Sequence, residues 1–349
     1  MKIITDWRMK DVWNNASLRP DRPLAKRDYC YASELAKPLI DRFLSMNAVE
    51  PTNPPNMRSR RKFLMGEIIE EMQGIVISLL GLRTDMQQQV NTNGIISVHG
   101  RIDFLVQGIP NYEKARFDVA KLGFSQSFID YLTSVINEFE RKMGDCNFAP
   151  MVRECKSCSE YLMNTLQEGG FVIGHKLQLF HYLKGLNLPL GYVDYISKGD
   201  SLMEDTRVEY PDDILEAQYN NSLSELKGYL DSNQRPPADP LIIFEGKFKK
   251  NFGVEYSNYL ELVYGYKTPQ DYSDTVKGKI ASWNRVLARI KDVSEGKRNK
   301  PTKAEPLGAL VKLTDKNKVV IEEMAKDGLD AYELAIVAKV DNEEEEDDL

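Results

Sequence analysis

The chain has 349 residues, of which 42% are hydrophobic and 28% are charged, a balance typical of a folded protein with one large core or a core and a small appendage. It contains no apolar run long enough to span a membrane and no apolar leader near Met1, so we expect no membrane segment and a cytoplasmic location. The net charge of −7 argues against a protein coated with basic surface, and the four cysteines are too few for a disulfide framework.

The charge is unevenly distributed along the chain. Six acidic residues lie in residues 342–349, an acidic tail that we expect to be solvated and disordered. Without this tail the chain is close to neutral, and it carries a local basic cluster. The cluster consists of Arg58, Arg60, Arg61 and Lys62. A solvated start of a helix and a set of phosphate contacts are both open interpretations of it.

The first elements in chain order are helical and then β-rich. Helical spacing of apolar residues predicts a helix over 32–46, with Ser33 as its N-cap, and a second helix over about 60–80 after the proline-rich PTNPP. Residues 92–108 are rich in β-branched residues and predict strands, with a hairpin or bulge near Gly100. Residues 111–145 are predicted to be a helical insertion.

The next elements alternate between strand and helix. We predict a short strand around 151–158, a helix over about 175–186 and a strand over about 192–197. Further helices are predicted at about 211–230 and 272–292. The order of these elements indicates an α/β fold with a mixed central sheet flanked by helices.

The end of the chain is predicted to be organised separately from a domain that covers residues 1–295. Residues 296–306 are polar, charged and interrupted by proline, which is typical of a linker. Residues 307–341 indicate a small segment of two short helices around an Asp-Gly turn. An αα-hairpin is the simpler interpretation of this pair, and a helix-turn-helix is the alternative.

The stretch MVRECKSCSEY, residues 151–161, has two incompatible interpretations. Cys155 and Cys158 have the C-x-x-C spacing of zinc sites, and His175 and His181 could complete a set of four ligands. On a continuous helix, however, the two histidines are about 600° of rotation apart, so their side chains diverge by roughly 120°. A redox pair is disfavoured because such a motif normally opens a helix, whereas this segment alternates as a strand does.

In the second interpretation, Glu154 and Lys156 are the functional residues of the stretch, and the cysteines only pack in the core. On a strand both side chains point to one face while Cys155 points to the other, where a small apolar residue suits the core. A carboxylate can hold a divalent cation, and a neighbouring ammonium group can orient a water molecule. This pattern favours a metal-dependent nuclease, although three residues alone are a weak signal.

Residues elsewhere in the chain support the nuclease interpretation. Asp103 is a carboxylate within an apolar, β-rich stretch, and Glu70 lies in a helix that is expected to be buried on one side. Gln178 and Tyr182 are spaced i and i+4, so they share a helix face with His175 one turn earlier. An acid, acid and lysine set followed by a Gln and Tyr helix face arises by chance far less often than any one part.

With these motifs in this order, the sequence resembles the PD-(D/E)xK nuclease superfamily, and within it the RecB-like branch of CRISPR-associated and recombination exonucleases. The family's helix motif G-x-x-x-(H/E) resembles Gly66 to Glu70, and its G-x-x-D resembles Gly100 to Asp103. Its (D/E)-x-K resembles Glu154 to Lys156, and its Q-x-x-x-Y resembles Gln178 to Tyr182. The resemblance implies a restriction-endonuclease-like core.

The resemblance also implies a metal site and a substrate. Asp103, Glu154 and the backbone carbonyl of Cys155 would bind Mg²⁺ or Mn²⁺, and Glu70 would complete the site or bind a second ion. Lys156 would orient the attacking water, while Gln178 and Tyr182 would hold the lysine or the DNA backbone. The expected DNA contacts are Arg58, Arg60, Arg61 and His175.

The sequence departs from the family pattern in two places. Val254 and Ser257 stand where many members have cysteines of an iron–sulfur cluster, and the four cysteines Cys30, Cys146, Cys155 and Cys158 do not fit that pattern, so we expect no cluster. The insertion at 111–145 lengthens the distance between Asp103 and Glu154. This insertion or the acidic tail could bind a protein partner.

The function that these patterns favour is a metal-dependent DNA nuclease, an exonuclease more than an endonuclease, in recombination, repair or phage DNA processing. Two alternatives stay open. One is a non-catalytic DNA-binding or assembly subunit that retains the nuclease fold, and the other is a structural zinc protein.

Overall fold

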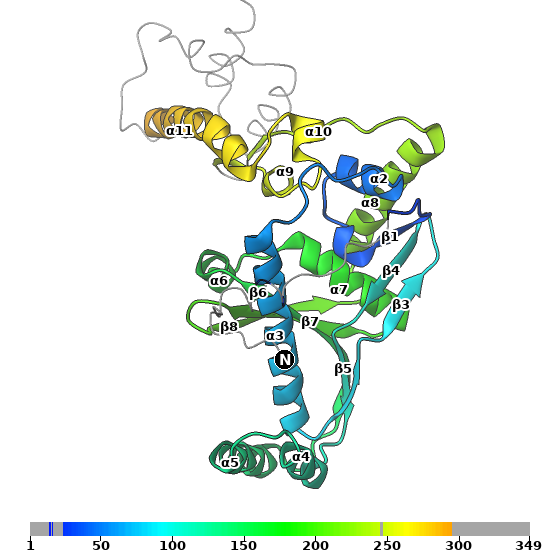
Figure 1. Ribbon diagram of the computed structural model, residues 1–349, viewed down its shortest axis with the longest axis vertical. Coiled ribbons are helices and arrows are strands. Elements are labelled where there is room, and N and C mark those ends of the chain that lie inside the picture. Colours follow the sequence, from blue (N-terminus) through cyan, green and yellow to red (C-terminus); the bar gives the residue numbers. More distant parts are fainter. Residues whose placement is uncertain (1–13, 15, 17–23, 245–246, 295–349) are drawn as a thin grey trace, which may run out of the picture. The chain divides into compact units, whose positions relative to one another are not determined.

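The computed structural model describes residues 14, 16, 24–244 and 247–294, and these residues fall into two compact units (Figure 1). The described residues of the first unit are 14 and 16 and those in 24–37, 42–50 and 55–236. Those of the second unit come from 38–41, 51–54 and 237–294. The predicted linker at 296–306, the helical segment at 307–341 and the acidic tail lie outside the described residues.

The first unit is built on a mixed five-stranded sheet, as the sequence predicted, with the strand order β2-β5-β6-β7-β8. The strands are β2 (Arg83–Met86), β5 (Phe104–Gly108), β6 (Phe148–Cys158), β7 (Leu190–Ser197) and β8 (Met203–Glu209). Only β6 and β7 run parallel, and the other neighbouring strands are antiparallel. The parallel pair requires a crossover, which α6 (Glu160–Gln167) and α7 (Ile173–Leu186) supply.

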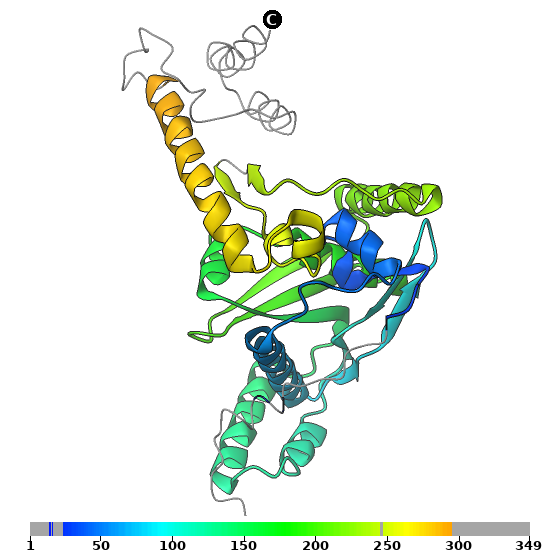
Figure 2. The ribbon, with the colours of Figure 1, turned by 45° about the horizontal axis from the view of Figure 1, so that its top comes forward.

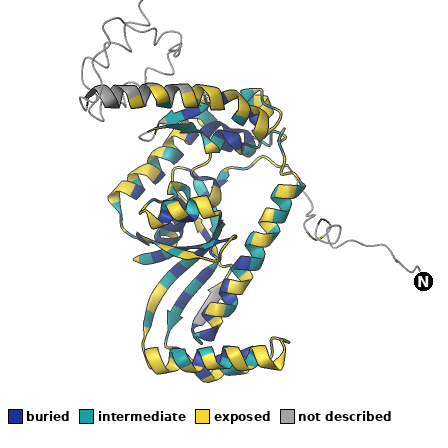
Figure 3. Cartoon of the chain, turned by 90° about the vertical axis from the view of Figure 1, so that its left-hand side faces the viewer, coloured by how far each residue is buried: buried dark blue, intermediate teal, exposed yellow. Residues whose placement is uncertain are grey.

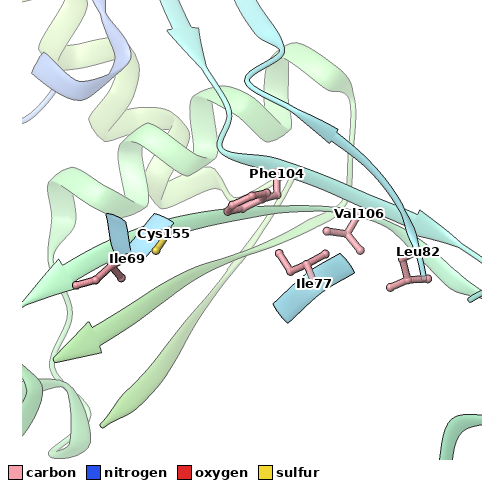
Figure 4. Packing of buried hydrophobic residues seen from close by; sticks show 6 residues of the cluster. All are labelled: Ile69, Ile77, Leu82, Phe104, Val106 and Cys155. Atoms are coloured by element: carbon pink, nitrogen blue, oxygen red, sulfur yellow. The ribbon is translucent and has the colours of Figure 1, made fainter. Parts of the chain in front are cut away.

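Helix α3 (Met57–Leu79) covers one face of this sheet. Asn56 caps the helix by accepting a hydrogen bond from the Ser59 N–H at 3.0 Å. Ile69 and Ile77 of α3 pack with Cys155 of β6, in a buried cluster that also contains Leu82, Phe104 and Val106 (Figure 4). Figure 2 shows α3, in dark blue, lying across one side of the sheet.

Helix α7 packs on the sheet through its own apolar residues. A Cβ atom on Gly191 of β7 would lie 2.9 Å from a methyl carbon of Leu179 and 3.2 Å from one of Leu183, so this glycine admits the helix at close range. Cys155 and its β7 partner Asp194 face α3, whereas Glu154 bonds to α7. The two helices therefore cover opposite faces, because successive strand residues alternate between them.

A second, three-stranded sheet has the order β1-β4-β3. It consists of β1 (Tyr29–Tyr31), β3 (Gln89–Thr92) and β4 (Ser97–Arg101). The expected hairpin or bulge near Gly100 is not formed: the hairpin turn lies earlier, between Thr92 and Ser97, and Gly100 lies within β4. After β4 the chain leaves this sheet at Ile102 and Asp103 and enters the five-stranded sheet as β5.

The predicted helix over 32–46 is wrong in its first part. The structure has a short 3-10 helix, η1 (Ala32–Glu34), and then α2 (Leu39–Met46), whose first three residues belong to the second unit. Ser33 lies inside η1 and is not an N-cap. Pro38 explains the break, because a proline disfavours helical backbone in the residue before it.

The predicted insertion between Asp103 and Glu154 is helical, as expected, and consists of α4 (Tyr112–Val119) and α5 (Gln126–Met143). A small core that contains Tyr112, Leu132 and Ile136 joins the two helices and includes Leu79 at the end of α3. The outer faces of both helices are largely exposed (Figure 3). The last helix of this unit is α8 (Asp213–Ser232), close to the predicted 211–230.

The second unit is small and mixed. Its elements are β9 (Ile242–Phe244), β10 (Phe248–Lys250), α9 (Phe252–Glu255), α10 (Leu260–Tyr264) and α11 (Pro269–Ser294). β9 and β10 form an antiparallel pair. The core consists of Ile242, Val254, Leu260, Tyr272 and Val276. Of these elements the sequence predicted only the long helix α11, at about 272–292.

Candidate active site

Strand β6 places Glu154 and Lys156 on the face of the sheet that α7 covers. Oε1 of Glu154 accepts hydrogen bonds from Nζ of Lys156 at 2.5 Å and from Nε2 of Gln178 at 2.7 Å. The Glu154 side chain is 1% exposed and that of Lys156 is 24% exposed, so the carboxylate is buried and the ammonium group lies at the edge of the site. Cys155 faces the opposite side, as predicted.

Asp103 reaches this site from the residue just before β5. Its Oδ2 accepts a hydrogen bond from the Cys155 N–H at 2.8 Å, so a side chain takes the place of a backbone carbonyl where the β5 ladder ends. The N–H and C=O of one strand residue point to the same side of the strand. The Cys155 carbonyl therefore also faces Asp103, and both oxygens lie at the same open edge of β6.

Gln178 and Tyr182 meet on one face of α7, as their spacing predicted. Nε2 of Gln178 lies 2.9 Å from the Tyr182 hydroxyl oxygen in addition to its bond to Glu154. A Cβ on Gly100 would lie 2.5 Å from Cε1 of Tyr182, so only glycine leaves room for this ring. Gly100 and Tyr182, which belong to separate sequence motifs, are thus in direct contact. Tyr182 in turn helps to orient the Gln178 amide that donates to Glu154.

Helix α3 brings Glu70 to the same group of charges. Gly66 lies one turn earlier, where an added Cβ would be 3.3 Å from Oγ of Ser157 on β6, so the helix approaches the strand closely there. Oε1 of Glu70 accepts a hydrogen bond from Nε2 of Gln87. Burial, reinforced by the charge of Asp103, raises the pKa of Glu70 to about 7.

The site brings together three acids, Asp103, Glu154 and Glu70, which are opposed by the ammonium group of Lys156 and the more distant guanidinium group of Arg101. Burial and the charges of Asp103 and Glu70 raise the pKa of Glu154, in spite of the opposing effect of Lys156. The two carboxylates Glu154 and Asp103 in turn raise the pKa of Lys156, although burial opposes its charge. Oε2 of Glu154 is buried and has no hydrogen-bond partner among the described residues. A surplus of acid and an unpartnered carboxylate oxygen are what a cation site requires.

The donor set fits a hard divalent cation. Asp103, Glu154 and the Cys155 carbonyl offer oxygen atoms only, and Mg²⁺ is usually bound through one or two carboxylates and several waters. Within the described ranges, no three side chains of the types His, Cys, Asp and Glu lie in position to hold a metal together. Two carboxylates and a carbonyl with water are therefore the set that these residues could supply, with Glu70 close by.

The zinc interpretation finds no support in the described residues. Helix α7 is continuous, and its two histidines are used elsewhere: Nδ1 of His175 lies 2.9 Å from the Tyr195 hydroxyl, and Nε2 of His181 lies 3.1 Å from the Val90 carbonyl. Burial, reinforced by the charge of Asp103, raises the pKa of Cys155 to about 12, so its thiol stays protonated at neutral pH.

The expected DNA contacts are not all part of this cluster. Arg58, Arg60 and Arg61 lie in the first turns of α3, and Nε of Arg60 donates to the Pro55 carbonyl at 3.2 Å. Arg58 is exposed, and the other two are half-buried. Burial, together with the charge of nearby Lys156, lowers the pKa of His175 to about 3. The histidine is therefore neutral.

Sequence reasoning missed a second group of buried charges, on the α3 face of the same strands. Nε and Nη2 of Arg153 donate to the two carboxylate oxygens of Asp194 on β7, at 2.8 and 2.6 Å. Asp194 also accepts a hydrogen bond from Gln73 of α3, and Arg153 reaches Asp205 of β8 at 3.0 Å. An aspartate within the apolar strand sequence GYVDYIS was the available signal. The network links four elements around the candidate site.

Comparisons with known proteins assign the chain to no family. No family model and no curated protein matches it. Among solved structures, the crystal structure of SSO0001 is 14% identical with a TM-score of 0.42, covering 73% of this chain and 95% of that one. The complex of LHK-Exo with dAMP is 13% identical with a TM-score of 0.36, over 64% and 93% of the two chains. The alkaline exonuclease LHK-Exo from Laribacter hongkongensis is 14% identical with a TM-score of 0.31, over the same shares.

Proposed function

We propose that this chain is a metal-dependent deoxyribonuclease of the PD-(D/E)xK type, with exonuclease action favoured over endonuclease action. The observation that supports it most is the arrangement around β6: Glu154 bound by Lys156 and Gln178, and Asp103 bound to the Cys155 N–H, in a site with surplus acid. None of the described helices has the length and apolar composition to cross a bilayer.

Asp103, Glu154 and the Cys155 carbonyl would hold Mg²⁺ or Mn²⁺, and Glu70 would complete the site or hold a second ion. When bound, such an ion polarises the scissile phosphate and lowers the pKa of a water molecule. The unpartnered Oε2 of Glu154 is the oxygen left for this role, because Oε1 is already bonded to Lys156 and Gln178.

Lys156 has two tasks in this proposal. Its ammonium group orients the attacking water, and it offsets the negative charge that develops on the phosphate oxygens. The raised pKa keeps it protonated at neutral pH. Gln178 fixes the Glu154 carboxylate from the α7 side, and Tyr182 fixes Gln178. Because these side chains are already held in place, they need not rearrange when negative charge develops on the phosphate during the reaction.

The substrate contacts follow from charge. Arg58, Arg60 and Arg61 in the first turns of α3 are the proposed phosphate contacts, and neutral His175 beside Lys156 is a hydrogen-bonding contact to the DNA. The proposed setting is DNA recombination, repair or phage DNA processing in the cytoplasm of a prokaryotic or phage-infected cell. The helical insertion and the acidic tail are the proposed contacts for protein partners.

The test is cleavage of end-labelled single- and double-stranded DNA with Mg²⁺ or Mn²⁺. Wild-type protein is compared with Lys156→Ala and with the control Cys158→Ser, which changes the buried cysteine two residues further along β6. Circular dichroism checks that each variant is folded. We expect cutting that is lost in the lysine variant and kept in the cysteine variant, and release of mononucleotides from an end.

Other outcomes would redirect the assignment. Absence of cutting by folded wild-type protein with either metal would indicate a non-catalytic DNA-binding or assembly subunit. Zinc that co-purifies with the wild type and is lost in Cys158→Ser would indicate the structural zinc protein.

A further inference from the structure

Two lysines from distant parts of the chain lie together where strands β6 and β7 end. The first of them, Lys198, follows β7 directly, and its N–H donates to the Cys158 carbonyl at 3.1 Å, as the last bond of the ladder between the two parallel strands. Ile196, two residues earlier, packs against the buried cluster beneath α3. Because alternate strand residues share a face, Lys198 lies on the side of the sheet that α3 covers.

Helix α3 brings the second lysine, Lys62, to the same end of the sheet. An added Cβ on Gly66 would lie 3.3 Å from Oγ of Ser157, and Ile69, later in the helix, packs with Cys155, earlier in the strand. The helix and β6 therefore run in opposite directions. Lys62 lies one turn before Gly66 on the same side of the helix, which places it beyond Ser157, at the end of β6.

The two ammonium groups repel each other and have no partner within the described ranges. Both side chains are exposed, and neither forms an ion pair or a hydrogen bond with a described residue. Partial burial and the charge of Lys62 lower the pKa of Lys198, so the two charges are close enough to act on each other. The geometry of the strands and the helix thus agrees with the electrostatics.

The two acids near this pair are turned to other groups. Asp200 accepts hydrogen bonds from the Leu202 N–H at 3.2 Å and from the Ser197 hydroxyl. Oε1 of Glu160, at the start of α6, lies against Gly199, where an added Cβ would be 2.0 Å from it. Among the described residues, neither carboxylate is paired with a lysine. Both ammonium groups are therefore able to bind an anion.

The lysine pair lies within reach of the candidate active site. Along β6, Lys156 comes two residues before Cys158, a distance of about 7 Å. Along α3, Glu70 comes eight residues after Lys62, a distance of about 12 Å. The phosphates of one DNA strand follow one another every 3.4 Å or so along the helix axis. A strand held in the active site would therefore bring a phosphate to the lysines within a few nucleotides.

We propose that Lys62 and Lys198 form a binding site for a phosphate of the DNA strand, beyond the end of β6 and a few nucleotides from the phosphate that is cut. The proposal rests on the proposed nuclease function for naming DNA as the ligand, and it adds Lys198, which belongs to none of the sequence motifs. A phosphate between the two ammonium groups would offset their repulsion. Such a contact positions the strand and carries no sequence preference.

The test is binding of a fluorescently labelled duplex and a labelled single strand by anisotropy, with the full chain in EDTA to prevent cleavage. For Lys62→Gln/Lys198→Gln we expect affinity for at least one probe to fall by about tenfold in low salt. The logarithmic dependence of that affinity on salt should become shallower, by about 0.9 on the duplex or 0.7 on the single strand for one lost phosphate contact. Wild-type affinity for both probes would overturn the proposal.

Two control variants separate this site from a general effect of charge. Lys277→Gln/Lys279→Gln removes the same two charges from exposed positions of α11 and should bind as the wild type does. Lys62→Arg/Lys198→Arg keeps both charges and should also retain affinity. A loss of equal size in the α11 variant would show that only net charge matters, and it would overturn the proposal.

Melting temperatures test whether the lysines serve the fold instead. Because the two ammonium groups repel each other, Lys62→Gln should melt in low salt at the same or a higher temperature than the wild type. A fall of many degrees would show a structural role and would overturn the proposal. So would a site for free phosphate alone, in which inorganic phosphate raises the melting temperature of the wild type while Lys62→Gln/Lys198→Gln keeps its DNA affinity.

The outcome for this site is distinguishable from the outcome for the nuclease. Lys156→Ala should lose cleavage and still bind DNA through Lys62 and Lys198. If folded wild-type protein cuts no DNA with either metal, but its DNA affinity in EDTA still depends on the two lysines, the nuclease function fails and the phosphate site stands. If cleavage is confirmed and affinity does not depend on them, the nuclease function stands and the phosphate site fails.

Discussion

Strand β6 carries two clusters of buried charge on its opposite faces, and the two differ in how completely they are matched. On the α3 face, both carboxylate oxygens of Asp194 accept hydrogen bonds from Arg153. On the α7 face, Glu154 shares one ammonium group with Asp103 and Glu70, and one of its oxygens has no partner among the described residues. The Asp194 carboxylate is therefore fully paired, although Oε1 of Gln73 beside it has no hydrogen-bond partner among the described residues, whereas the Glu154 carboxylate keeps one buried oxygen unpaired.

The two clusters show two different roles for buried charge on one strand: an ion pair that fixes the packing, and a group of acids that are not fully paired. A buried ion pair contributes little net stability, but it penalises any arrangement that separates its partners. Arg153, Asp194 and Gln73 therefore fix how β6, β7 and α3 lie against one another. The α7 face can then keep its surplus of acid, because the neighbouring elements are already held in place.

The largest effect on stability is expected from breaking the ion pair between Arg153 and Asp194. Arg153→Ala would leave Asp194 buried without its main partner, and we expect a loss of about 3–5 kcal/mol in the free energy of unfolding. Urea denaturation measures it. The double variant Arg153→Leu/Asp194→Leu should recover much of the loss. A single variant that loses less than about 1 kcal/mol would show that the pair is not a structural anchor.

The opposite result is expected on the α7 face. Glu154→Gln keeps the shape of the side chain and cannot ionise. Above pH 8, where Glu154 is charged, the metal-free variant should therefore melt at the same or a higher temperature than the wild type. DNA cleavage should fall by roughly 100-fold or more, because a proposed metal ligand is lost. Calorimetry and single-turnover cleavage measure the two quantities. A variant that cuts normally would exclude Glu154 from the reaction.

A purely steric substitution, Gly100→Ala, tests the packing on the α7 face without changing any charge. Gly100→Ala would place a Cβ 2.5 Å from Cε1 of Tyr182 and 2.9 Å from Cβ of Ala32, and such overpacking costs about 1–3 kcal/mol. Displacement of the tyrosine should also weaken cleavage through Gln178. Gly66→Ala is the matched control, since its new Cβ would meet only Oγ of Ser157 at 3.3 Å, and it should cost less.

The smallest effect is a dependence of stability on pH that Mg²⁺ should remove. Because the folded-state pKa values of Glu70 and Glu154 are raised, to about 7 and about 8, stability is fully present below their unfolded values and is lost as pH rises through 7 and 8. The slope is at most about 1.4 kcal/mol per pH unit for each group.

The measurement is the melting temperature in EDTA and in Mg²⁺ between pH 6.5 and 8.5. The lower limit avoids the buried histidines: the lowered pKa values of His175 and His181, about 3 and about 4, remove stability as pH falls below 6.5. We expect Mg²⁺ to raise the melting temperature more at pH 8.5 than at pH 6.5. A rise that is equal at both ends would contradict a cation bound by these acids.

The elements that the sequence predicted are those with a local signal. Alternation around 151–158 gave β6, and helical spacing gave α3 and α7, together with the contact of Gln178 with Tyr182 one turn away. Pro38 ended the expected first helix, because the restriction it places on the residue before it outweighed the helical spacing. The short strands β2, β9 and β10, and the longer but highly charged strand β8, carried too little apolar periodicity to be recognised.

The parts of the site that were not predicted depend on contacts between distant segments. The bond from the Cys155 N–H to Asp103 spans 52 positions, and the contact of Gly100 with Tyr182 joins two separate motifs. The network of Arg153 and Asp194 was missed because the sequence of a single strand does not show which strand it pairs with, or in which register. The roles assigned to the acids and the lysine stay predictions until cleavage and metal binding are measured.

The α4 and α5 insertion enters the chain between β5 and β6, at the ends of these strands that are far from the acids. From Phe148, where β6 begins, to Glu154 the extended chain covers about 20 Å. The pairing of Phe104 with Arg153 aligns Asp103 with Cys155 whatever length of chain joins the two strands. In evolutionary terms this junction would tolerate insertions of different length and composition, because they would leave Asp103 aligned with Cys155.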